Sequence, residues 1–98
     1  MMFNTRVRVP EDVLVSELEG ESVLLNLKSE TYYGLDQMGT RMWFALTTGG
    51  TIQEAFDSLC AEYDVEPDTL RADLSTLVEK LVSNGLLQPM ADQESPKP

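Results

Sequence analysis

The sequence predicts an α+β domain in which a three-stranded antiparallel sheet is followed by three helices. The main observation is a change in the spacing of the apolar residues. They alternate with a period of two up to Leu35, as in strands, and recur at about 3.6 residues beyond it, as in amphipathic helices. With 98 residues, the chain is long enough to bury one compact core and little more.

Three runs before residue 36 have the composition of short strands. Apolar and β-branched residues dominate 13–18, 23–27 and 31–35. The runs are separated by Glu19-Gly20-Glu21 and by Lys28-Ser29-Glu30, both of which are typical of tight connections. Short connections favour an antiparallel meander. Residues 1–12 are expected to form an N-terminal arm or a lead-in strand, because an alternating run there is stopped by Pro10.

The helices are predicted from their end signals. Asp36 is a good N-cap for a helix that runs to Leu46 and stops at Gly49-Gly50. Gly39 within this helix costs stability, so close packing against the sheet is its expected role. The second helix is predicted to begin at the capping box of Thr51 and Glu54.

A third helix is predicted to begin at Pro67, whose missing N–H is tolerated in a first turn, and to end at Asn84-Gly85. Leu86-Leu87 then either adds a short strand or docks on the core. We expect the folded domain to span residues 13–88 and residues 89–98 to form a flexible tail.

Composition argues against several classes of protein. Seventeen acidic residues against seven basic ones give a formal net charge of −10, which disfavours nucleic acids and anionic membranes and attracts basic peptides. The chain has no histidine, and its one cysteine, Cys60, falls on a predicted core stripe. We therefore expect no metal and no cofactor. No membrane span or signal peptide is visible, so the cytoplasm is the expected compartment.

A catalytic site is not predicted. Nucleophilic catalysis needs a base beside the nucleophile, and histidine, the usual base, is missing. The carboxylates of residues 62, 64, 66 and 68 lie between two predicted helices, where a solvated charged turn is the usual arrangement. We expect a binding protein and not an enzyme.

Two other functions remain open. Three helices beside a small sheet resemble a winged helix-turn-helix, so the alternative is a winged-helix nucleic-acid-binding regulator. Its recognition helix would offer only Arg71 and Lys80 against Asp68, Asp73 and Glu79. A scaffold that contacts only folded proteins is also open.

Peptide binding is favoured by the strands. A sheet of three strands leaves edges with unpaired N–H and C=O groups, and an extended peptide can add itself there as a further strand. Thr31, Tyr32 and Tyr33 are the expected receiving edge. The face that carries Tyr33 and Leu35 is expected to belong to the core.

Several segments taken in order carry a resemblance to a known family. They are Glu21–Leu27, Thr31–Asp36, Gly39–Leu46, Thr51–Ala55, Tyr63–Val65, Leu70 with Asp73-Leu74, then Leu77, Leu81 and Gly85–Leu87. Together they resemble the PqqD-like family, the recognition elements for precursors of ribosomally synthesised, post-translationally modified peptides. The resemblance covers roughly residues 13–88.

The resemblance implies a winged-helix-like fold and a function. The leader segment of a precursor peptide would add to the third strand, in the groove between it and the third helix. The partners implied are that leader peptide and a modifying enzyme such as a leader peptidase, cyclase or radical enzyme, as in lasso-peptide or pyrroloquinoline-quinone pathways. Two sets of residues would contact the leader: Glu30, Thr31, Tyr32 and Tyr33 on the strand, and Leu70, Asp73, Leu74, Leu77 and Lys80 on the helix. The three leucines also lie on the predicted core stripe. They could therefore either line the peptide-binding pocket or simply pack in the core, and both roles stay open.

Overall fold

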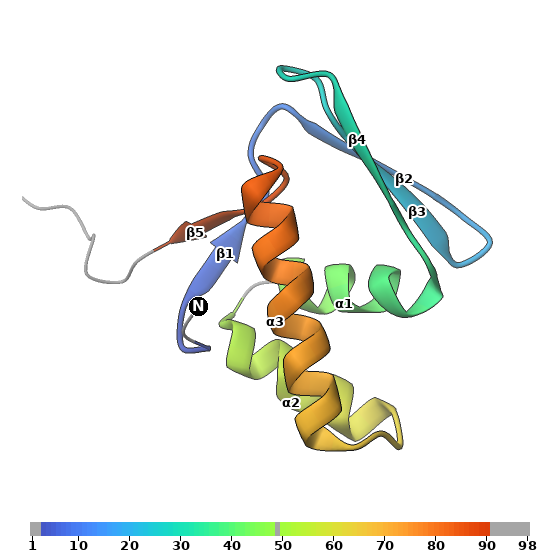
Figure 1. Ribbon diagram of the computed structural model, residues 1–98, viewed down its shortest axis with the longest axis vertical. Coiled ribbons are helices and arrows are strands. Elements are labelled where there is room, and N and C mark those ends of the chain that lie inside the picture. The colour runs from blue at the N-terminus through green and yellow to red at the C-terminus, as the bar shows by residue number, and fades with distance from the viewer. Residues whose placement is uncertain (1–2, 49, 91–98) are drawn as a thin grey trace, which may run out of the picture.

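A computed structural model describes residues 3–48 and 50–90 and contains the predicted sheet (Figure 1). Its strands are β2 (Val13–Leu18), β3 (Glu21–Asn26) and β4 (Thr31–Leu35), all antiparallel, in the order β2-β3-β4. The predicted meander is confirmed. β3 begins two residues earlier and ends one residue earlier than expected, because Leu27 already belongs to the turn before β4.

The three predicted helices follow the sheet: α1 (Gln37–Thr47), α2 (Ile52–Glu62) and α3 (Pro67–Ser83). Asp36 caps α1 by accepting a hydrogen bond from the Gly39 N–H at 2.8 Å. A Cβ at Gly39 would lie 3.2 Å from the Leu35 side chain, which explains the glycine by close packing where β4 meets α1. The capping box of Thr51 and Glu54 is formed at the start of α2.

The N-terminal arm contains a strand, β1 (Arg6–Arg8), but this strand does not join the meander. It pairs with β5 (Gln88–Met90) from the other end of the described chain (Figure 1). The arm also completes the cap of α2, because the Ile52 N–H donates to the Thr5 carbonyl at 2.9 Å and the Gln53 N–H to the Phe3 carbonyl at 2.7 Å.

The end of the domain differs from the expectation. Pro89 and Met90, which were expected in the tail, belong to β5. The physical reason is the burial of Leu86 and Leu87, at 0% and 1% exposed, which returns the chain to β1. Residues 91–98 of the expected tail, and Gly49 of the predicted helix stop, lie outside the described residues.

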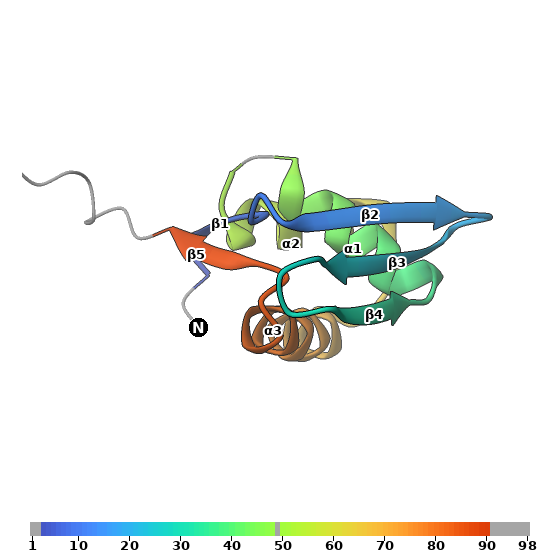
Figure 2. The ribbon, with the colours of Figure 1, turned by 90° about the horizontal axis from the view of Figure 1, so that it is seen from above.

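The core lies between the sheet and the helices, which cover one face of the sheet (Figures 1 and 2). Leu24 at the centre of β3 is completely buried, as are Leu74 and Leu81 of α3, and Trp43 of α1 is 2% exposed. Cys60 is half-buried and packs against this core. None of the helices in residues 3–48 and 50–90 is both long enough and apolar enough to cross a membrane.

Candidate functional site

β4 is an edge strand whose outer side is open. It pairs with β3, and within the described parts of the chain no strand pairs with its other edge. Tyr32 is 72% exposed and projects from the face away from the helices, whereas Thr31 and Tyr33 are half-buried on the helix side. Leu35, on that same side, is in the core, as predicted. In an antiparallel edge strand, alternate residues direct their N–H and C=O groups away from the sheet. β4 therefore has main-chain groups free to pair with an added strand.

Glu30 lies in the turn that precedes β4 and not in the strand. Its backbone has a positive φ of 60°, and its N–H donates to the Asn26 carbonyl at 2.8 Å. That N–H is therefore engaged within the hairpin. The exposed Glu30 side chain remains at the entrance to the β4 edge.

α3 divides the other expected site residues into two groups. Leu70 and Leu74 are 3% and 0% exposed, so the structure places them in the core behind the surface. Leu77 is half-buried against that core, and Asp73 and Lys80 are exposed. Leu70 and Leu74 are therefore core residues, whereas Leu77 packs against the core and is also partly exposed to solvent.

Asp73, Leu77 and Lys80 share one flank of α3, because residues spaced by four and three lie on one side of a helix. The opposite flank contacts the N-terminal arm and α2: the Arg71 guanidinium lies 4.5 Å from the Phe3 ring centre and 4.9 Å from that of Phe56. Figure 2 shows β4 as the strand of the sheet nearest to α3. We take the flank of α3 that carries Asp73, Leu77 and Lys80, called the free flank, and the open edge of β4 as the two walls of the candidate site.

The face of the sheet away from the helices is also unusually apolar. Register places Leu14, Leu25 and Tyr32 side by side across the three strands, with Val23 and Leu18 further along. Leu14 is 53% exposed, Val23 46% and Leu18 74%. We call this surface the outer apolar face. A hollow of about 730 Å³ lies at the β2–β3 turn end of the sheet, where residues of both faces and of the start of α1 line it.

Sequence reasoning missed the outer apolar face, although a signal is present. The runs Val13-Leu14-Val15 and Val23-Leu24-Leu25 do not alternate with polar residues, and a strand that is apolar on both sides normally has both faces covered. Here only the helix side is covered (Figure 1).

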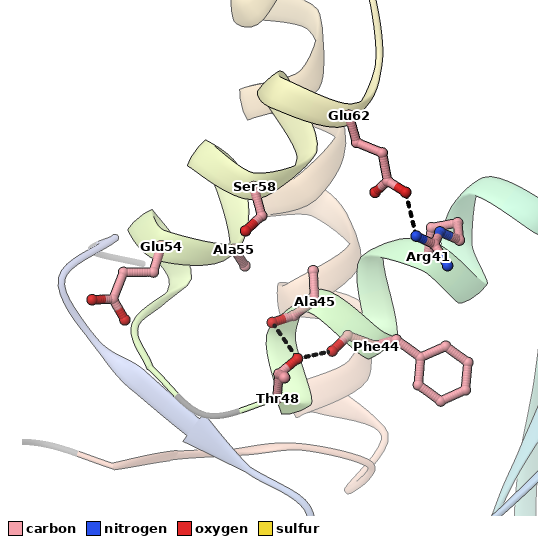
Figure 3. A pocket seen from close by; sticks show the side chains of 8 residues that line it. All are labelled: Arg41, Phe44, Ala45, Thr48, Glu54, Ala55, Ser58 and Glu62. Atoms are coloured by element: carbon pink, nitrogen blue, oxygen red, sulfur yellow. Dashed lines mark hydrogen bonds and ion pairs between the residues drawn. The ribbon is translucent and has the colours of Figure 1, made fainter.

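A second hollow of about 370 Å³ lies between α1 and α2 (Figure 3). Its charged groups are already paired: Arg41 forms an ion pair with Glu62, and Glu54 accepts from the Thr51 N–H in the capping box. The hydrogen bond to Glu62 also raises the pKa of the Arg41 guanidinium above its ordinary value. The charged groups that line the hollow are therefore engaged within the protein, and the sequence has no histidine that could act as a base beside its hydroxyl groups.

The charged surface of α3 offers little to phosphates. On α3, Arg71 is stacked on two aromatic rings, and Asp68, Asp73 and Glu79 are exposed. Nucleic-acid affinity depends on cationic groups that displace counterions, so this helix is poorly suited to a DNA groove. Within residues 3–48 and 50–90, no cluster of three or more potential metal ligands occurs.

Comparison with known proteins places this arrangement in a family. The family model described as PqqD, coenzyme PQQ synthesis protein D, matches residues 21–87. No curated protein matches the chain.

Two solved structures share the fold over nearly the whole of their own chains. TbiB1, in complex with the TbiA(beta) leader peptide, is 36% identical, has a TM-score of 0.78, and aligns over 87% of this chain and 99% of its own. A lasso peptide synthetase B1 complexed with the leader peptide is 26% identical, has a TM-score of 0.75, and aligns over 86% of this chain and 99% of its own. The matched region exceeds half of the sequence and contains the whole sheet except β2 together with all three helices, and on this evidence the chain belongs to the PqqD family.

Proposed function

We propose that this protein binds the leader segment of a ribosomally made precursor peptide, by strand addition to β4, and presents it to a modifying enzyme. The observation that carries the proposal is the open β4 edge beside the free flank of α3. It occurs in a fold shared with two proteins that were solved with leader peptides bound. The protein acts as a binding partner and not as a catalyst.

Main-chain pairing supplies only part of the affinity. β4 has five residues, so two or three of them can pair with an added strand. Each hydrogen bond contributes about 0.5–1.5 kcal/mol net, whereas ordering a flexible peptide costs about 2–5 kcal/mol. Side-chain contacts must therefore supply the remainder. Thr31 and Tyr33 on the strand, with Asp73, Leu77 and Lys80 on α3, are the residues placed to make them.

Leu70 and Leu74 contribute indirectly in this proposal. Both are buried, so they hold the half-buried Leu77 and its flank of α3 at the correct depth for the peptide. Glu30 acts at the entrance to the site through its exposed side chain. Tyr32, which projects onto the outer apolar face, contributes its main chain to the peptide and its ring to that face.

The outer apolar face supports the second half of the proposal, presentation to an enzyme. Large exposed apolar surfaces on a small domain are typical of protein–protein contact sites. A peptide added to β4 becomes the fourth strand of the same sheet, and its alternate side chains join the outer apolar face. An enzyme docked there contacts the domain and the bound leader together, whether it is a leader peptidase, a cyclase or a radical enzyme.

A fluorescence-polarisation titration tests the proposal. The probe is a labelled leader segment from a short open reading frame adjacent to this gene, and its scrambled sequence is the control. We expect saturable binding with a Kd of about 1 µM or tighter, which corresponds to about −8 kcal/mol. Adding the modifying enzyme encoded beside the gene should raise the polarisation further, because a ternary complex forms.

Two results would contradict the proposal. Absence of leader binding by a chain with a verified folded spectrum would remove peptide recognition and favour a scaffold for folded proteins. Binding that the scrambled peptide reproduces would show attraction by net charge alone.

A further inference from the structure

Asn26 is a buried polar side chain at the point where the β3–β4 hairpin meets the end of α3. It is the last residue of β3 and is 8% exposed. Its Oδ1 accepts hydrogen bonds from the N–H groups of Lys28 at 2.9 Å and Ser29 at 3.1 Å. Its Nδ2 donates to the Gly85 carbonyl at 2.7 Å. One amide group therefore links the turn that precedes β4 to the turn that ends α3.

Gly85 is the other half of this link. The Leu86 N–H donates to the Leu81 carbonyl at 2.8 Å and the Gly85 N–H to the Val82 carbonyl at 3.1 Å, which is the Schellman pattern of a helix end. Gly85 has the positive φ, 72°, that this pattern requires. A Cβ at Gly85 would also lie only 2.9 Å from Asn26 Nδ2, so glycine is needed for the approach as well as for the backbone.

Both walls of the candidate site begin at this link. Thr31, the first residue of β4, lies directly opposite Asn26 in the β3–β4 register. α3 ends at Ser83, two residues before Gly85. Among the side-chain hydrogen bonds found in residues 3–48 and 50–90, the bond from Asn26 to Gly85 is the one that joins the sheet to the end of α3.

We propose that Asn26 is a positioning residue for the leader peptide. Its amide holds the open edge of β4 at a fixed distance and orientation from the free flank of α3, so peptide affinity depends on a side chain that the peptide does not touch. This inference rests on the proposed leader-binding function. It identifies the element that keeps the site preformed, and a preformed site lowers the ordering cost of binding.

The substitution Asn26→Asp isolates the link from the hairpin. It keeps the side-chain size and the oxygen that accepts from Lys28 and Ser29, and it replaces the group that donates to Gly85 with a second oxygen. Two facing oxygens repel, so the link opens while the hairpin keeps its own hydrogen bonds. We expect the Kd for the adjacent-gene leader to rise about tenfold, the factor typical of a lost buried hydrogen bond that leaves its partner unpaired.

Ser22→Ala is the matched control. Ser22 also projects from the helix side of β3, is 3% exposed, and forms a buried hydrogen bond of 2.8 Å with the Thr40 hydroxyl of α1. Its loss lowers the thermal midpoint without affecting either wall of the site. We expect the leader Kd of this variant to stay within about twofold of the unmodified chain, because both are fully folded at the temperature of the titration.

Residual dipolar couplings of the free proteins measure the orientation of α3 relative to the sheet, which a loss of stability alone does not change. They should report a changed orientation of α3 relative to the sheet in Asn26→Asp and an unchanged one in Ser22→Ala. If Asn26→Asp does not fold, Asn26→Ser replaces it, since a shorter hydroxyl still accepts from the hairpin but does not reach Gly85.

The inference is overturned if leader affinity is unchanged in the folded Asn26 variant, or if both variants lose the same affinity for the same fall in thermal midpoint. The titration of the unmodified chain separates this outcome from a failure of the proposed function. If the proposed function is wrong, the unmodified chain binds no leader, and Asn26 then has no role in leader binding.

Discussion

The two edge strands of the sheet, β2 and β4, pair with the same central strand but differ in chemistry. Five of the six residues of β2 are exposed, and its Glu17 projects from the side that faces the helices, in register with Ser22 and Leu35. β4 has no charged residue, and its Tyr33 and Leu35 pack on the core. A charge that points inward on an edge strand opposes the addition of another strand. The difference indicates that β2 is a protected edge and β4 a receptive one.

The largest effect is expected from removing main-chain donors from each edge. Because neighbouring residues alternate in direction, one of Thr31→Pro and Tyr32→Pro removes an N–H that points away from the sheet. That variant should weaken leader binding about tenfold to hundredfold, from about 1–3 kcal/mol of lost pairing and ring clash. Ser16→Pro and Glu17→Pro on β2 are the controls. Unchanged affinity in both β4 variants, with folding intact, would eliminate strand addition.

A smaller effect is expected from the α3 wall. Lys80→Ala removes an exposed side chain whose alkyl part lies on the same flank as Leu77, and it should weaken leader binding about threefold, near the upper range of an exposed charge contact. Glu79→Ala, on another side of α3, is the matched control. The titration should be repeated at high salt. If the contact is electrostatic, the difference in leader Kd between the two variants becomes smaller there. Equal affinities of both variants at low salt would remove Lys80 from the site.

The smallest effect is expected from removing the inward-pointing charge of β2. Glu17→Val removes the inward charge and leaves an apolar edge, so weak self-association should appear in sedimentation velocity at about 100 µM or above. Glu11→Val, outside the strands, is the control for a lost surface charge. A Glu17→Val chain that stays monomeric at millimolar concentration would show that edge protection at β2 comes from another source.

Local features explain why most of the fold was predictable. The Asp36 cap, the box of Thr51 and Glu54, Pro67 and Asn84-Gly85 act within a few residues, and the helices begin and end close to them. The strand runs are separated by short turn signals at residues 19–21 and 28–30, so their number and order followed as well. The resemblance pointed to β4, which the structure shows to be an edge strand, but it did not separate the buried Leu70 and Leu74 from the exposed Asp73 and Lys80 on α3.

Contacts between distant segments were not predictable in this way. The pairing of β1 with β5 joins Arg6 to Met90, and nothing in either tripeptide specifies the other, so Pro89 and Met90 were assigned to a tail. The link between Asn26 and Gly85 likewise depends on where the sheet rests on α3. An asparagine in a strand and a glycine after a helix each have ordinary local explanations.

The amino-acid order determines the periods, caps and turns, and therefore the three strands, the three helices and the acidic surface, because each depends on near neighbours or on composition. The folded arrangement decides which edge stays open, which leucines of α3 face outward and which apolar face of the sheet is left uncovered. These three features depend on how segments far apart in the chain pack together, because the burial of a residue depends on all the elements around it.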